Sequence, residues 1–135
     1  MSGAIYNAID QNAKLRSLGV GDVYSDYESE TISRDHLTVI LRWGAQQYQR
    51  SVRTGPRDLD VYVHMPKEYG TDFTTINLCL AEITSTLEEM EQVVGPDNVV
   101  VTEAVKVGSS GNIYDPGFES MSRSVSYRVQ LREMV

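Results

Sequence analysis

Residues 71–94 read TDFTTINLCLAEITSTLEEMEQVV, and this stretch decides the fold of the chain. Its apolar side chains recur at alternating steps of three and four, the period of a helix with one buried stripe. They are Phe73, Ile76, Leu80, Ile83, Leu87, Met90 and Val94. Thr71 and Asp72 can cap the first turn, and Gly95-Pro96 follows where such a helix ends. The pattern predicts one long central helix over residues 71–94.

The opposite side of this predicted helix carries only acidic charge. Its glutamates are Glu82, Glu88, Glu89 and Glu91, and no lysine or arginine accompanies them. A helix with one apolar stripe needs a sheet to pack on, so its charged side is left for water or for a partner. We therefore expect an acidic surface here.

The composition is typical of one globular domain. The 135 residues are 41% hydrophobic and 23% charged, and we expect residues 1–135 to form a single domain. The net charge of −7 disfavours general binding to nucleic acid or anionic membranes. No apolar run approaches the roughly 20 residues of a membrane span, and the start MSGAIYNAID lacks the features of a signal peptide. The single cysteine, Cys79, is expected to be a small buried hydrophobe in a soluble protein made in a reducing compartment.

Four segments outside the central helix predict strands, because they are rich in β-branched residues or alternate in polarity. They are residues 36–43, 59–65, 99–107 and 122–132. In the third segment, the valines expected to share one side are Val99, Val101, Val105 and Val107. Residues 2–18 predict an N-terminal helix closed by Gly19. Residues 22–35 carry no pattern that assigns a firm element.

The order of these elements is helix, strand, strand, helix, strand, strand. This order predicts an α+β domain with an antiparallel sheet of about four strands, built from two hairpins. The N-terminal helix and the long central helix are expected to pack on one face of that sheet.

Two connections are longer than a hairpin needs, and both carry residues that are enriched at interfaces. Residues 44–57 contain Arg50, Arg53 and Arg57. Residues 108–121 contain Ile113, Tyr114 and Phe118. These loops predict contact with a partner, and the alternative is that both are solvated hairpin tips.

The sequence offers little catalytic chemistry. It has two histidines, no cluster with metal-ligand spacing and no phosphate-binding glycine loop, so we expect no catalytic residue, metal or cofactor. One alternative rests on residues 36–39, HLTV, which fit the H-φ-[ST]-φ motif of two-histidine phosphoesterases and would make His36 an acid–base group. The second histidine stands in HMPK at residues 64–67, where proline replaces the hydroxyl residue that this family requires.

The end of the chain carries its most particular motif. Residues 114–119 are YDPGFE, and residues 123–129 are RSVSYRV. They are similar to the C-terminal motif Y-D-x-G-F…R-x-V-x-Y-x-V of tail terminator (tail completion) proteins from actinobacterial phages. Over residues 2–133, the order of helices and long-looped hairpins also resembles the tail terminators of long-tailed siphophages.

This resemblance implies a structural virion protein without catalysis. It implies a homo-oligomeric ring, expected to be a hexamer, that caps the tail tube, stops its polymerisation and joins it to the head connector. The implied location is the head–tail interface of the virion after assembly in the host cytoplasm. Genomic DNA would pass through the lumen without specific binding.

A closed ring needs a contact between two different patches of neighbouring subunits. We expect Arg50, Arg53 and Arg57 to reach a neighbouring subunit or the tail tube protein, with DNA in the lumen as their alternative partner. The complementary patch is expected to be Glu82, Glu88, Glu89 and Glu91, and the apolar anchors Ile113, Tyr114 and Phe118. A head-to-tail stopper or neck adaptor is the main alternative function, and a standalone dimeric ligand-binding domain is a third.

Overall fold

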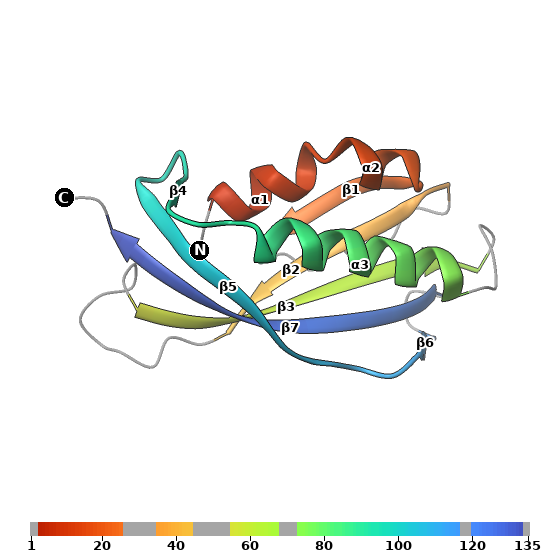
Figure 1. Cartoon of the computed structure of the whole chain (residues 1–135). Coiled ribbons are helices and arrows are strands. Elements are labelled where there is room, and N and C mark those ends of the chain that lie inside the picture. Colours follow the sequence, from red (N-terminus) through yellow and green to blue (C-terminus); the bar gives the residue numbers. More distant parts are fainter. Residues whose placement is uncertain (1–2, 26–34, 45–54, 68–72, 117–119, 134–135) are drawn as a thin grey trace.

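The computed structural model describes residues 3–25, 35–44, 55–67, 73–116 and 120–133. These residues form a mixed α+β fold, in which a curled seven-stranded sheet carries three helices on one face (Figure 1). The helices are α1 (Gly3–Asp10), α2 (Ala13–Ser17) and α3 (Phe73–Glu88). The strands are β1 (Val20–Ser25), β2 (Leu37–Trp43), β3 (Gly55–Pro66), β4 (Val93–Val94), β5 (Val99–Ser109), β6 (Ile113–Asp115) and β7 (Ser120–Glu133).

The sheet is larger than the sequence predicts. Its order is β1-β2-β3-β7-β5-β4, and β6 also pairs with β7. The two expected hairpins, β2–β3 and β5–β7, are confirmed as antiparallel pairs. The expectation of about four antiparallel strands is wrong, because β1, β4 and β6 are added and β1 runs parallel to β2. The long strands β3 and β7 pair over their whole length and join the two hairpins into one sheet.

Strand β1 forms in the segment to which the sequence assigns no element. Its buried residues Val20 and Val23 are three positions apart, whereas side chains that share one face of a regular strand are two apart. The register shifts between Val20 and Asp22, and the extra residue returns Val23 to the core side of the sheet. The irregularity hides the alternation on which strand prediction depends.

Helix α3 is shorter than predicted. It ends at Glu88 rather than at Val94, so the expectation of one long helix over residues 71–94 is wrong. Gln92 adopts a left-handed backbone with φ of 53°, and Val93–Val94 then pair with β5 as strand β4. Met90 lies beyond the end of the helix but is still buried. A non-helical turn, in which its amide binds the Leu87 carbonyl, places its side chain in the core. The apolar periodicity therefore continues past the end of the helix.

The predicted N-terminal helix over residues 2–18 is divided into α1 and α2. Asn12 lies between them, and its side-chain oxygen accepts a hydrogen bond from the Leu15 amide at 3.0 Å. Its side-chain amide donates to the Glu82 carboxylate at 2.9 Å and to the Thr86 hydroxyl at 3.0 Å. Asn12 thus caps α2 and ties it to α3, which holds the helical layer together.

The hydrophobic core lies between the helices and the sheet. Ile5 and Ile9 of α1, Ile83 of α3, and Leu59 and Tyr127 of the sheet are fully buried there. The predicted alternation of residues 122–132 is confirmed for the apolar side, since Val125, Tyr127, Val129 and Leu131 are all buried. Within the described residues, no helix is both long enough and apolar enough to span a membrane.

The valine row predicted along residues 99–107 is broken in the structure. Val99 and Val101 are buried, but Val105 and Val107 are 45% and 55% exposed. The register of β5 against β7 shifts between Val101 and Glu103, and again between Lys106 and Gly108. Each shift moves the following side chains to the other face of the strand. As a result, Lys106 rather than its valine neighbours faces the helices.

Candidate functional site

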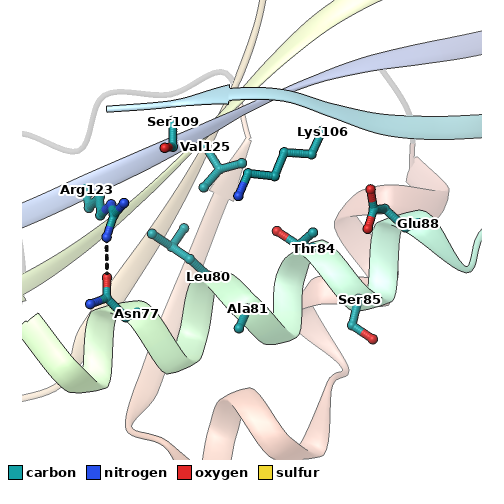
Figure 2. Close-up of a pocket in the computed structure, with 10 residues that line it drawn as sticks. All are labelled: Asn77, Leu80, Ala81, Thr84, Ser85, Glu88, Lys106, Ser109, Arg123 and Val125. Carbon is teal, nitrogen blue, oxygen red and sulfur yellow. Dashed lines mark hydrogen bonds between the residues drawn. The ribbon is translucent and has the colours of Figure 1, made fainter. Parts of the chain in front are cut away.

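An open groove lies between α3 and the C-terminal half of β5, with residues of β7 between them (Figure 2). Its volume is about 490 Å³. The lining residues are Asn77, Leu80, Ala81, Thr84, Ser85, Glu88, Lys106, Ser109, Arg123 and Val125. Two cations and one acid therefore share a groove whose other lining side chains are apolar, carry hydroxyl groups or, at Asn77, carry an amide.

Arg123 is held in place at one end of the groove. It lies two residues before Val125, on the side of β7 that otherwise carries apolar residues. Its guanidinium donates to the Asn77 side-chain oxygen at 2.8 Å and to the Ser110 carbonyl at 3.1 Å. Both acceptors are neutral, so these bonds fix the orientation of the guanidinium without neutralising its charge.

Lys106 extends from β5 toward α3 and into the groove (Figure 2). It forms no ion pair with any residue in the described part of the chain. Glu88, at the end of α3, lines the same groove. The groove therefore holds an ammonium group that is available to an external acceptor.

A hydroxyl pair connects the helix to the sheet beside the groove. The Thr84 hydroxyl lies 2.6 Å from the hydroxyl of Tyr127, which is fully buried. Burial raises the pKa of the Tyr127 phenol to about 12, because desolvation disfavours the phenolate. Burial likewise raises the pKa of the Cys79 thiol to about 11, which favours a structural role for this cysteine over a nucleophilic one.

The stability of the fold is expected to fall in alkaline solution. Tyr127 and Cys79 have higher pKa values in the folded chain than their ordinary values of 10.0 and 9.0. The stability that they contribute is therefore complete below pH 9, and it is lost as the pH rises through about 11 and then 12. The shift of about two units at Tyr127 corresponds to roughly 2–3 kcal/mol. Urea unfolding at pH 8, 10 and 11 measures this loss.

Two substitutions test the origin of this alkaline loss. Cys79→Ala and Tyr127→Phe each remove one ionising group, so the free energy of unfolding of each variant should depend less steeply on pH than that of the wild type. An unchanged slope in both variants would show that other groups cause the loss.

The four predicted acidic residues do not share one surface. Glu82 faces α2, where the Asn12 amide and then Lys14 at 3.6 Å lower the pKa of its carboxyl. Glu88 lines the groove. Glu89 and Glu91 are exposed at the end of α3, beyond its last residue. Glu88, Glu89 and Glu91 are all exposed, and Glu89 and Glu91 are the two that lie outside the groove.

Arg57 packs on its own chain. Its guanidinium donates to the Gly44 carbonyl at 3.0 Å and lies 5.6 Å from the centre of the Trp43 ring. These contacts fix Arg57, half-buried, near the start of the inner strand β3. Arg50 and Arg53 lie outside the described residues. Of the three predicted arginines, the structure therefore describes only Arg57.

Ile113 and Tyr114 form an exposed apolar pair on β6. Their side chains are 44% and 55% exposed, and pairing with Ser122 and Met121 of β7 fixes their backbone. Phe118, the third predicted anchor, lies outside the described residues. The structure thus presents two of the three predicted anchors on a short strand at the edge of the sheet.

Both histidines have partners in the structure. The Nε2 atom of His36 lies 2.6 Å from the Asp22 carboxylate, and Nδ1 of His64 lies 3.1 Å from the Ser120 hydroxyl. Ser120 is fully buried, so a substrate cannot reach its hydroxyl in this arrangement. Among the described residues, no group of three or more histidine, cysteine, aspartate or glutamate side chains could hold a metal ion.

Comparison with known proteins finds similar solved structures. No protein-family model and no curated protein matches this sequence. Among solved structures, the fold is similar to that of a chain in the virion of the native gene transfer agent (GTA) particle. The TM-score is 0.59 and the identity 14%, and the match covers 95% of this chain and 91% of that chain. This likeness shows that the two chains share a fold.

Sequence reasoning missed Lys106 and Arg123 as groove residues. Arg123 was detectable in principle, because it is a charge in register with the apolar residues Val125 and Tyr127. Lys106 was not, because the β5 register shifts that turn it toward α3 leave no mark on the valine pattern around it.

Proposed function

We propose that this chain is a structural protein of a phage-like virion and that it serves as a tail terminator. In this role it forms a ring on the tail tube, stops tube polymerisation and joins the tube to the head connector. The observation that carries the proposal is the shared fold with a chain of the GTA virion, which extends over 95% of this chain. The similarity of residues 114–129 to the C-terminal motif of tail terminator sequences supports the more specific assignment as a tail terminator.

The proposed partners are other copies of this chain, the tail tube protein and the head connector or stopper. We propose a hexameric ring, as the resemblance to tail terminators implies; two different complementary patches form a ring when the rotation between neighbouring subunits closes. The net charge of −7 supports passage of DNA through the lumen without specific binding. The proposed tube anchors are Ile113 and Tyr114, together with Phe118.

The predicted arginines remain part of this proposal. Arg50 and Arg53 are proposed to reach a neighbouring subunit or the tube. Arg57 is proposed to support the same part of the sheet, because its guanidinium is already bound to Gly44 and packed on Trp43.

Native mass spectrometry of the purified chain, alone and mixed with tail tubes, tests the proposed function. A hexamer, or a monomer that binds tubes only at one end, is the expected result, and electron microscopy of the tube ends locates the bound protein. A discrete dimer that ignores tubes would contradict the proposal. A ring that binds the connector but not the tube would instead indicate a head-to-tail stopper.

A further inference from the structure

We propose that the groove between α3 and β5 receives the acidic turn of a second copy of this chain. The acidic turn is defined as residues 89–91, and its carboxylates would pair with Lys106 and Arg123 of the neighbouring copy. The inference rests on the proposed function, because it names the contact that joins one subunit of the ring to the next.

The groove holds cations that have no carboxylate partner among the residues that the structure describes. Elsewhere in the described chain, Lys14 pairs with Glu82, Arg16 with Asp10 and Arg128 with Asp58. In the groove, Arg123 binds only neutral oxygens and Lys106 has no ion pair among the described residues. Two unneutralised cations therefore face one open volume of about 490 Å³.

The acidic turn is the matching feature on the surface of the same chain. Glu89 and Glu91 are exposed, and neither contacts a cation in the described part of the chain. The turn itself is fixed, because Met90 between them is buried and its amide binds the Leu87 carbonyl at 3.1 Å. Arg132 also donates to the Gln92 side-chain oxygen at 3.2 Å. Two carboxylates are thus presented by a backbone that is already ordered.

A second copy is the partner that these charges favour. Copies with a net charge of −7 repel one another at long range, and a contact between patches of opposite sign offsets that repulsion. The groove and the acidic turn consist of different residues, as a ring contact requires, and they adjoin at Glu88 at the end of the groove. Both are pre-organised, since Arg123 is fixed by two hydrogen bonds and the turn by Met90, and this lowers the entropy lost on binding.

Glu88 gives the proposed contact a distinctive property. It lines the groove, so its carboxylate would repel an incoming Glu89 or Glu91. Glu88→Gln should therefore strengthen self-association, although it removes a charged residue from the interface. Sedimentation velocity over a range of protein concentrations measures this change.

Zero-length cross-linking tests the contact directly. Equal amounts of ¹⁴N- and ¹⁵N-labelled protein are mixed, treated with a carbodiimide that joins a carboxylate to an amine, and digested for mass spectrometry. We expect peptides of mixed isotopic composition that link Lys106 to Glu89 or Glu91. Cross-links of Lys106 only to Glu88 of the same labelled chain would overturn the inference.

A charge exchange tests the contact in solution. Lys106→Glu and Glu91→Lys should each weaken self-association by at least about tenfold, and the double variant should regain most of that loss. Arg128→Glu is the matched control, because it makes the same change of charge on the opposite face of the sheet, in an exposed pair with Asp58. Circular dichroism and thermal unfolding establish that each variant is folded.

The outcomes separate this inference from the proposed function. Rings that persist in both single variants would overturn the groove contact and leave the terminator role intact. A weakened ring that the double variant does not restore would also overturn the contact, because the acidic turn would not be the partner. A two-fold dimer that shows the charge exchange would support the contact and contradict the terminator ring. A wild-type chain that stays monomeric alone and on tubes would contradict both.

Discussion

Replacing Tyr127 with alanine should lower the free energy of unfolding by about 3–5 kcal/mol, the usual cost of removing a large aromatic side chain from a core. Tyr127 has the largest volume among the fully buried side chains, and it lies on β7, which pairs with both β3 and β5. Its hydroxyl also joins the sheet to Thr84 of α3 at 2.6 Å. Urea unfolding at neutral pH, followed by circular dichroism, measures the loss.

Tyr127→Phe separates the two contributions of this residue. It keeps the ring in the core and removes only the hydrogen bond to Thr84, so it should cost about 1 kcal/mol. Thr84 is half-buried beside an open groove, and water can replace the lost partner. Equal losses for the alanine and phenylalanine variants would show that the hydrogen bond, not the packing, dominates.

Removing the exposed apolar pair on β6 should abolish tube capping without unfolding the chain. The double variant Ile113→Ser and Tyr114→Ser removes two side chains that are 44% and 55% exposed, so the core is left unchanged. Apolar and aromatic anchors at the centre of an interface contribute about 2 kcal/mol each, which predicts tube binding weaker by roughly 1000-fold. Tube binding by sedimentation and tube length by electron microscopy measure the effect.

Leu78→Ser is the matched control for this prediction. Leu78 is 49% exposed, but it lies on α3 rather than on β6. It should leave capping unchanged. If Leu78→Ser weakened capping as much as the β6 variant, the loss would follow from replacing any exposed apolar side chain with serine, and β6 would not be the tube anchor.

The structure changes the electrostatic picture of the proposed ring. The sequence suggests an arginine loop facing an acidic helix, but Glu82 is bound to α2 and Arg57 to Gly44 of its own chain. Glu88, Glu89 and Glu91 remain exposed, and two cations without a carboxylate partner among the described residues, Lys106 and Arg123, lie in the groove. A sequence shows only where charged residues occur. The structure shows which of these charged side chains already form hydrogen bonds or ion pairs within the chain.

The sequence by itself determined the parts of the fold that depend on local periodicity. Steps of three and four along residues 73–88 specify α3, and the alternation of residues 122–132 specifies β7 and its buried side. Residues 36–43 are apolar on both faces, which correctly predicts an inner strand, since β2 lies between β1 and β3. Ile113 and Tyr114 were also identified from sequence as exposed residues, because aromatic and apolar residues stood in a turn-rich loop.

Only the tertiary structure decided the sheet order, the end of α3 and the groove. β3 and β7 pair because each can form a full ladder, and no local pattern specifies that partner. α3 ends at Glu88, and Val93–Val94 pair with Val101 and Val100 of β5, so a strand pairing outweighs a helical period that continues to Val94. The groove depends on Arg123 meeting Asn77, 46 residues away, and on register shifts that turn Lys106 toward α3. Long-range contacts of this kind arise from the packing of the whole chain, and they leave no periodic trace in its sequence.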